Sequence, residues 1–262
     1  TASTGGSSGA PVINNKGEAV ALNAGSQNKS ANAFFMPLDN VVKALDKIKQ
    51  NEEIPRGTLQ TTFKVRPYAE LVRLGLNKEI EAQFRTDFPD IKGLLVIDSI
   101  LPESFAAEKM AVGDILIAMN GEPVTNFLAL ENIINAAVGK STEIELLRSG
   151  QLLQVTVKVE DLYALSPRSY LKFDSSLFNT LSYQQARHFN RPNVGAYVAY
   201  SGAAFSAAGI GNHSVIIEFN GKKIDNVEQL ATQLSLIPTG ERVHVRYVAK
   251  SQPSKVNYAS VE

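Results

Sequence analysis

The sequence predicts a mixed β and α+β fold in which a short N-terminal segment precedes two copies of one small domain. The order of strand-like and helix-like patterns in residues 54–160 returns in residues 167–262. An Asn-Gly pair, which favours a tight hairpin turn, occurs at residues 120–121 and again at residues 220–221. Residues 1–50 match neither copy. An offset of about one hundred residues suits two small domains and is too long for the units of a solenoid.

The first copy is expected to run strand, helix, strand, hairpin, helix and strand. Its second helix places apolar residues at helical spacing, and Gly139 stands where that helix should end. Its last strand alternates polar and apolar residues, as a strand with one buried face does. In chain order these elements are expected at residues 56–63, 67–76, 93–98, 115–124, 127–137 and 143–148.

The second copy is expected to follow the same order, with Gly240 after its second helix. Residues 161–167 are the expected linker, because Pro167 disfavours regular structure in the residue before it. The elements of this copy are expected at residues 168–173, 181–189, 195–200, 215–224, 227–237 and 242–248.

Residues 1–50 open within a Gly/Ser-rich stretch, Thr4-Gly-Gly-Ser-Ser-Gly-Ala-Pro-Val-Ile. We expect a turn and two strands to follow, at residues 19–25 and 33–38, with a polar loop between the strands. A helix is expected at residues 38–49, because Val41, Val42, Leu45 and Ile48 form an apolar stripe at helical spacing.

The composition argues against several classes of function. Lys and Arg together number 26, as do Asp and Glu, so the basic excess typical of nucleic-acid or anionic-membrane binding is missing. The chain has no Cys, and no His, Asp or Glu cluster has the spacing of metal ligands. No apolar run approaches the roughly 20 residues of a membrane-spanning helix. We therefore expect no nucleic acid, membrane, metal or cofactor among the binding partners.

The order of elements in both copies resembles the circularly permuted PDZ domain of HtrA-type proteases. The first copy carries Leu101-Pro-Glu-Ser-Phe-Ala-Ala and then Val112-Gly-Asp-Ile-Leu, a phrase usual in that family. The second copy departs from it, with Asn212-His213 in place of Gly-Asp. The resemblance implies binding of protein or peptide ligands, C-terminal peptides among them. Such peptides add to a sheet edge, and backbone N–H groups hold the carboxylate.

The resemblance places these backbone groups in the stretch before the first helix of each copy. Leu59 and Leu171 would then form apolar pockets for the peptide. The alternative is that segments of the chain itself fill these strands and only pack the domains together. The peptide-binding residues implied are Thr58, Leu59, Gln60 and Thr61 in the first copy and, by position, Tyr170, Leu171, Lys172 and Phe173 in the second.

Residues 1–50 resemble the end of the chymotrypsin-like barrel of HtrA-type proteases. The pattern is Gly-X-Ser-Gly-X-Pro, a hairpin, a small-residue strand and then Phe34-Phe-Met-Pro-Leu-Asp. It implies that Ser8 is the nucleophile and that the backbone N–H groups of Gly6 and Ser8 form the oxyanion hole. Residues 21–25 would line the pocket for the substrate residue before the scissile bond.

Two observations leave alternatives open for this segment. The Gly/Ser run on its own fits a flexible loop better than a catalytic turn. Ser7 is a second candidate nucleophile, although the spacing to Pro11 favours Ser8. The segment also departs from the family pattern, because Ala10 stands where a Gly is usual.

The residues that would activate the serine do not precede it in this chain. A catalytic serine needs a base, and in chymotrypsin-like barrels the His and Asp come before the Ser. Only seven residues precede Ser8, whereas His188, His213 and His244 all lie in the second copy. We therefore expect this chain to be part of a longer protein and to be inactive alone.

Taken together, these segments resemble the fungal pro-apoptotic nuclear branch of the HtrA-type proteases. The fold class is then the C-terminal piece of a chymotrypsin-like β-barrel, residues 1–50, followed by two circularly permuted PDZ-like domains, residues 54–160 and 167–262. The resemblance implies a homo-oligomeric serine endopeptidase of the nucleus, with the cytoplasm as a further location, linked to stress response and apoptosis. The rival hypothesis is a non-catalytic peptide-binding scaffold with a degenerate protease remnant.

Overall fold

The structure is a computed structural model that describes residues 6–27 and 32–262. Residues 1–5, which include the start of the Gly/Ser-rich stretch, and residues 28–31 of the expected polar loop lie outside the described residues. The chain divides into two compact units, Thr1–Pro55 and Arg56–Glu262. The first unit contains the segment with Ser8, and the second contains both copies of the repeated domain, called here the first and second repeats.

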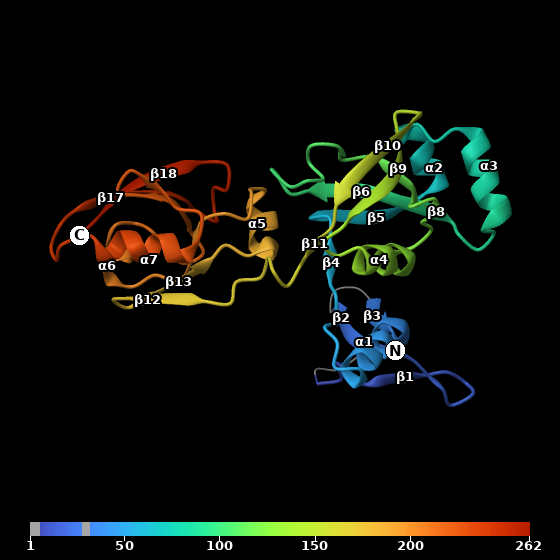
Figure 1. The fold of residues 1–262 in the computed structure, drawn as a ribbon, viewed down its shortest axis with the longest axis horizontal. Helices are drawn as coiled ribbons and strands as arrows, with labels where there is room; N and C mark the ends of the chain where they lie inside the picture. The colour runs from blue at the N-terminus through green and yellow to red at the C-terminus, as the bar shows by residue number, and fades with distance from the viewer. Residues whose placement is uncertain (1–5, 28–31) are drawn as a thin grey trace. The chain divides into compact units, whose positions relative to one another are not determined.

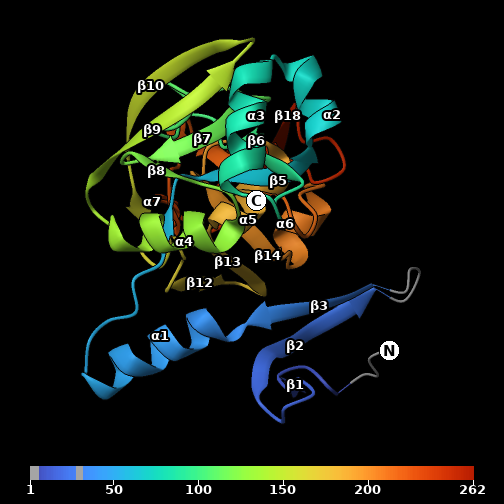
Figure 2. The ribbon, with the colours of Figure 1, turned by 90° about the vertical axis from the view of Figure 1, so that its right-hand side faces the viewer.

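The first unit is a three-stranded antiparallel sheet followed by one helix. The strands are β1 (Pro11–Ile13), β2 (Ala19–Gln27) and β3 (Asn32–Pro37), in the order β1-β2-β3. The helix, α1, spans Leu38–Lys49 and confirms the helix expected from the apolar stripe. Figure 2 shows β2 and β3 side by side, with β3 leading directly into α1.

The apolar stripe of α1 is not buried. No residue of this helix is buried, and Val42, Leu45 and Ile48 are 52%, 46% and 62% exposed. Phe34 and Phe35 on β3 are also about half exposed. An amphipathic helix gains most of its stability by burying its apolar face, so this unit has more apolar surface than it covers.

The first repeat is built on an antiparallel sheet in the order β10-β9-β7-β6-β5, with helices on its faces. Figure 1 shows α4 on one side of this sheet and α2 and α3 on the other. The apolar residues between sheet and α4, Leu95, Leu116 and Ile144 among them, are fully buried. The elements are β4 (Gly57–Thr58), β5 (Thr61–Pro67), α2 (Tyr68–Leu71), the 3-10 helix η1 (Val72–Leu74), α3 (Lys78–Asp87), β6 (Gly93–Ile100), β7 (Ile115–Met119), β8 (Glu122–Pro123), α4 (Phe127–Ala136), β9 (Ser141–Arg148), β10 (Gln151–Lys158) and β11 (Glu160–Asp161).

The second repeat has the same architecture, with strand order β12-β13-β14-β15-β17-β18. Its core lies between the sheet and α7, where Phe178 and Phe205 meet edge to face. The elements are β12 (Tyr170–Phe173), β13 (Ser176–Thr180), α5 (Tyr183–Phe189), β14 (Ala196–Tyr200), α6 (Ala203–Ala207), β15 (Val215–Phe219), β16 (Lys222–Lys223), α7 (Val227–Ser235), β17 (Val243–Val248) and β18 (Val256–Val261).

Two shared irregularities align the repeats residue by residue. The β5–β6 ladder has a bulge between Thr62 and Phe63, and the β13–β14 ladder has one between Leu177 and Phe178. Both hairpins expected at Asn-Gly pairs form, with positive φ at each of the four residues. The bulge therefore aligns β5 with β13 and α2 with α5.

A second alignment corrects the expected replacement of the Gly-Asp pair. Gly113 donates to Ile97 O and His213 donates to Val198 O, both from left-handed backbone, with φ of 94° and 66°. His213 thus takes the place of Gly113, and Ser214 takes that of Asp114. In the second repeat, His213-Ser214 therefore stands in place of Gly-Asp. The sequence pattern had indicated Asn212-His213, one residue earlier.

Candidate functional site

The Ser8 segment forms a short loop held against β2. Gly9 N–H donates to Asn23 O at 2.7 Å, and Asn23 N–H donates to Ala10 O at 2.9 Å. Ala10 N–H closes the turn on Ser7 O at 3.1 Å. Gly6 and Gly9 have φ of 93° and 83°, which an L-residue reaches only with strain. The loop therefore depends on both glycines.

Ala10, the departure from the family pattern, fits this loop without strain. It lies outside the left-handed region that Gly6 and Gly9 occupy, so its Cβ carries no backbone cost. The side chain is exposed. The alanine therefore does not argue against a catalytic turn.

The two serines of the loop have different surroundings. Asn23 Nδ2 donates to Ser7 Oγ at 2.9 Å and to Ser7 O at 3.1 Å, whereas Ser8 is exposed. The backbone N–H groups of Gly6 and Ser8 have no backbone acceptor among the described residues. The exposed hydroxyl and these N–H groups are the kinds of group that a nucleophile and an oxyanion hole need.

Asn23 is the residue of this site that the sequence did not single out. It is 8% exposed in a strand of mostly small and apolar residues, within the expected pocket stretch 21–25. Its Oδ1 accepts from Gly25 N–H at 3.3 Å, beside a bulge between Asn23 and Gly25. An amide residue among the small and apolar residues of this strand marks the position in the sequence, although its partner in the loop cannot be identified from it.

All three histidines lie in the second unit, where two are exposed and one contacts a tyrosine hydroxyl. His188 is exposed on α5, and His244 is exposed on β17, between buried Val243 and Val245. His213 Nδ1 lies 2.6 Å from the hydroxyl of buried Tyr197.

The expected peptide-binding loop of the first repeat is tightly held. Thr58, Leu59 and Gln60 are at most 7% exposed, and Gln60 has a left-handed φ of 54°. Gln60 N–H donates to Thr58 Oγ1, and Gln60 O accepts from Leu101 N–H, both at 2.9 Å. Thr61 begins β5 and is partly buried. These bonds fix the loop at the end of the strand to which a peptide would add.

Segments of the chain itself lie on one side of this loop. Thr58 pairs with Glu160 of β11, and the side chain of Gln60 also contacts Glu160. Gly57 packs so closely on α4 that a Cβ there would lie 2.2 Å from Ile134 O. The chain itself therefore covers β4, which is the packing role that the second alternative assigned to this stretch.

The adjacent strand β5 remains open. Among the described residues it pairs with β6 alone, which leaves its other edge without a partner. Phe63 and Ile134 contribute partly buried apolar surface beside Leu59 in the same core cluster. An open strand edge next to an apolar surface is the geometry that β-strand addition needs.

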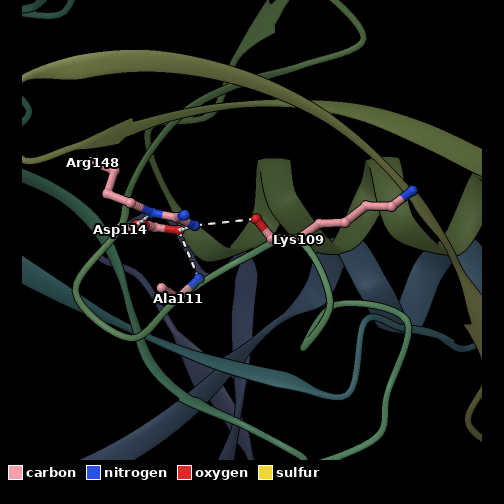
Figure 3. Close-up of polar contacts among 4 residues, drawn as sticks. All are labelled: Lys109, Ala111, Asp114 and Arg148. Carbon is pink, nitrogen blue, oxygen red and sulfur yellow. Dashed lines mark hydrogen bonds and ion pairs between the residues drawn. The ribbon is translucent and has the colours of Figure 1, made fainter.

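An ion pair between a buried carboxylate and a partly exposed arginine shapes the loop before β7 (Figure 3). Asp114 is fully buried and receives Arg148 Nε and Nη2, both at 2.7 Å, and Ala111 N–H at 2.8 Å. Arg148 Nη2 also donates to Lys109 O at 3.1 Å. The hydrogen bond to Asp114 raises the pKa of the Arg148 guanidinium above its ordinary value. The pair therefore fastens the Val112-Gly-Asp phrase to β9.

The four expected peptide-binding residues of the second repeat lie on β12. Tyr170 is 76% exposed and Phe173 is 40% exposed, whereas Leu171 packs against the core. Counting back from the shared bulge, the residues that correspond to Thr58–Thr61 are 173–176. Tyr170, Leu171 and Lys172 thus precede the equivalent loop, and Phe173 begins it.

The repeats contact each other through an apolar cluster. Leu101 of the first repeat is buried with Leu181, Tyr183 and Val248 of the second. Burial raises the pKa of Tyr183 above its ordinary value, while Arg187 and a hydrogen bond with Thr58 act in the opposite direction. Leu101, just after β6, therefore packs against α5 of the second repeat.

The described residues contain no group of three or more His, Cys, Asp or Glu that could hold a metal ion. No helix in the described ranges, 6–27 and 32–262, has the length and apolar character to cross a membrane.

Comparison with protein families identifies both repeats. Residues 67–147 match the model described as PDZ domain, and residues 164–240 match the model described as PDZ-like domain.

Curated relatives match nearly the whole chain. It is 41% identical over 256 residues to Protease Do-like 7 of Arabidopsis thaliana, covering 94% of this chain and 23% of that protein. It is 37% identical over 259 residues to the pro-apoptotic serine protease NMA111 of Candida glabrata, covering 98% of this chain and 26% of that protein. The chain thus spans about a quarter of the length of the curated relatives that it matches.

Solved structures give a weaker likeness. The structure "HtrA-type protease AlgW with decapeptide" matches with a TM-score of 0.38 and 18% identity, over 55% of this chain and 42% of that one. The serine endoprotease from Yersinia pestis matches with a TM-score of 0.33 and 19% identity, over 58% of this chain and 46% of that one.

The family and relative matches confirm the predicted fold class, a protease-domain segment followed by two PDZ-like domains.

Proposed function

This chain belongs to the HtrA-type proteases with PDZ domains, and from that membership we propose that it forms the nucleophile-bearing end of a serine endopeptidase. The observation that carries the proposal is the Ser8 loop. Ser8 is exposed, and the backbone N–H groups of Gly6 and Ser8 have no backbone acceptor among the described residues. The hydroxyl of the neighbouring Ser7, in contrast, accepts a hydrogen bond from Asn23 Nδ2. That difference supports Ser8 over Ser7 as the nucleophile.

The loop supplies two parts of the chemistry. Ser8 Oγ attacks the scissile carbonyl, and the N–H groups of Gly6 and Ser8 stabilise the negative charge that develops on the carbonyl oxygen. The proton of Ser8 passes to a histidine in the part of the protein that precedes this chain. The exposed apolar surface of α1 and β3 supports the proposal that the rest of a protease barrel packs on this unit, because a completed barrel would cover that surface.

The PDZ repeats bind protein or peptide ligands and deliver them to the protease or regulate it. The open edge of β5 supports the first repeat as a receptor for C-terminal peptides. Relatives named as pro-apoptotic link the full-length protein to apoptosis. We propose further that it acts in the nucleus and the cytoplasm in the stress response. It does so as a homo-oligomer, without nucleic-acid or membrane partners.

A fluorophosphonate probe tests the proposal on the full-length protein. We expect labelling at Ser8, loss of labelling and of proteolysis in Ser8→Ala, and retention of both in the neighbouring control Ser7→Ala. The 262-residue chain alone should not be labelled. Labelling that survives Ser8→Ala would contradict the nucleophile assignment. A full-length protein that is never labelled would support a peptide-binding scaffold instead.

A further inference from the structure

The two repeats differ at the strand edge to which a peptide would add. The shared bulge makes β13 the equivalent of β5, and each strand pairs on one side with the next strand of its sheet, β14 or β6. Among the described residues, the other edge of β5 has no partner. The other edge of β13 is fully paired with β12, from Tyr170 opposite Asn179 to Phe173 opposite Ser176.

The direction of β12 is that of a bound C-terminal peptide. β12 runs antiparallel to β13 and ends at Phe173, where a two-residue turn with left-handed Asp174 leads into β13. A peptide that adds to β5 in the PDZ manner would also run antiparallel, with its carboxylate at the loop that precedes the strand. The chain therefore places its own residues where such a ligand would lie.

The side chains of β12 follow the same pattern. Leu171 lies opposite Phe178 and packs against the core cluster that contains Val227 and Leu230 of α7. Tyr170 and Lys172, the residues on either side of it, are exposed. One inward residue between two outward residues is what a strand-adding peptide presents to a groove.

The helix that borders the groove, α7, also contacts β12 and Ser169, the residue just before this strand. α7 packs against β12 and β13, as Figure 1 shows. Ser169 Oγ donates to Glu228 Oε1 of α7 at 2.6 Å, just before the strand begins. In the first repeat the equivalent stretch, β4, turns away from β5 and pairs with β11.

We propose that β12 is an internal ligand that closes the peptide groove of the second repeat. Leu171 fills the apolar site between β13 and α7, and the β12 backbone completes the sheet edge. The second repeat therefore does not accept peptides by strand addition, and this form of recognition is confined to the first repeat. The inference rests on the PDZ mode of binding proposed above for the first repeat.

The test uses a synthetic peptide with the sequence of residues 168–173 and a free carboxylate, added to the 262-residue chain and followed by NMR. Wild type should show no shift of the Phe178 and Val227 amides. In Leu171→Asp the charge cannot remain against the apolar core, so β12 should detach. The peptide should then bind at those amides, at least about tenfold tighter than to wild type.

The matched control is Lys172→Ser, on the outward face of the same strand, which should behave as wild type. Hydrogen exchange supplies a second readout. Alternate β12 amides should be protected in wild type and in the control, and should lose protection in Leu171→Asp while β14 and β15 stay protected. Peptide binding at Phe178 in wild type, with β12 still protected, would overturn the proposal.

A third measurement does not depend on a destabilised variant. The chain has no Cys, so Lys172→Cys with Leu177→Cys introduces a single pair at directly opposed positions. Such residues have Cβ atoms about 4.5–5.5 Å apart, within reach of a disulfide after small adjustment. The disulfide should form on mild oxidation. Failure to form it would show that β12 does not lie on β13 in solution and would overturn the proposal.

These results are independent of the function of the first repeat. A C-terminal peptide titrated against the amides of Thr61 and Phe63 reports on that repeat alone. If neither repeat accepts a peptide, even in Leu171→Asp, the PDZ mode proposed for this chain is wrong. Binding at Phe63 together with Phe178 shifts in wild type would show that only the internal-ligand proposal is wrong.

Discussion

Asn23 shows how one buried amide can hold a surface loop from a neighbouring strand. Its backbone bonds with Gly9 and Ala10 and its side chain with Ser7, so it touches the loop on both sides of Ser8 without contacting the Ser8 hydroxyl. It is a positioning residue for the proposed nucleophile. Its role depends on a pairing of distant positions, which a local pattern does not reveal.

We expect Asn23→Ala to lower fluorophosphonate labelling of Ser8 in the full-length protein by about tenfold to a hundredfold, because small displacements of a catalytic group are costly. Intrinsic proteolysis should fall in parallel, while the KM for substrate changes little. The control is Asn15→Ala, an exposed residue in the turn of the same hairpin. Equal labelling of the two variants would show that Asn23 does not position the loop.

The Asp114–Arg148 pair is the second residue-scale feature. Asp114→Asn should lower the free energy of opening of the first repeat by about 1–3 kcal/mol, because it removes the charge of a buried carboxylate that accepts a bidentate hydrogen bond. Native-state hydrogen exchange of the β7 amides measures this. Asp98→Asn is the control, since Asp98 pairs with exposed Lys64 and such surface pairs contribute about 0–1 kcal/mol. An equal effect of both substitutions would contradict the argument.

At the scale of elements, the sequence predicted most helices and the Asn-Gly hairpins. It missed several strands whose position depends on pairing with distant strands. The helices α1, α4 and α7 and both Asn-Gly hairpins were readable from periodicity and turn residues. α3 was not predicted, although Asn77 accepts from Ile80 N–H as a helix cap does. Its apolar positions are too few to form a clear stripe.

The closing strands β10 and β18 and the hairpin of β12 with β13 were also not predicted as such. β12 was expected as a strand, but residues 170–173 were also expected to be the counterpart of the loop Thr58–Thr61 in the first repeat. The sequence could not show that it folds back on β13, because the turn at Asp174 and Ser175 lacks the glycine that usually marks a two-residue hairpin. Only the shared bulge fixes the correspondence.

Gly57 connects β4 to α4 and carries a prediction at this scale. In Gly57→Ala the new Cβ would meet backbone atoms of Ile134, so the strand must move away from the helix. We expect a loss of about 1–3 kcal/mol in the stability of the first repeat. Thermal unfolding and exchange of the α4 amides measure it.

The control for Gly57→Ala is Gly211→Ala. A Cβ at Gly211 meets no atom within 4 Å, and this glycine is outside the positive-φ group. Its effect should stay within about 0.5 kcal/mol. A Gly57 variant as stable as the Gly211 variant would show that β4 is not pressed against α4.

At the scale of the second unit, burial of tyrosines predicts a response to alkaline pH. Desolvation raises the pKa values of Tyr68, Tyr183 and Tyr197 in the folded protein. The unfolded chain then releases these protons at lower pH than the folded chain. Their contribution to stability is thus complete below about pH 10 and is lost as pH rises through the folded pKa values.

Urea unfolding from about pH 8 to about pH 11 measures this contribution. The midpoint should fall at the alkaline end for wild type and fall less steeply for Tyr183→Phe, which removes one of the three hydroxyls. Tyr170→Phe is the control, since Tyr170 is 76% exposed. Identical slopes for the two variants would mean that burial of Tyr183 does not contribute.

The attachment of β12 has a consequence for how the two grooves respond to concentration. A segment joined to its site by a two-residue turn acts at an effective concentration of about millimolar or more. A free peptide at micromolar concentration would therefore need an intrinsic affinity about a thousandfold greater to displace it. On this proposal, the first repeat would fill and empty as its ligands become abundant or scarce, whereas the second would stay filled at any dilution.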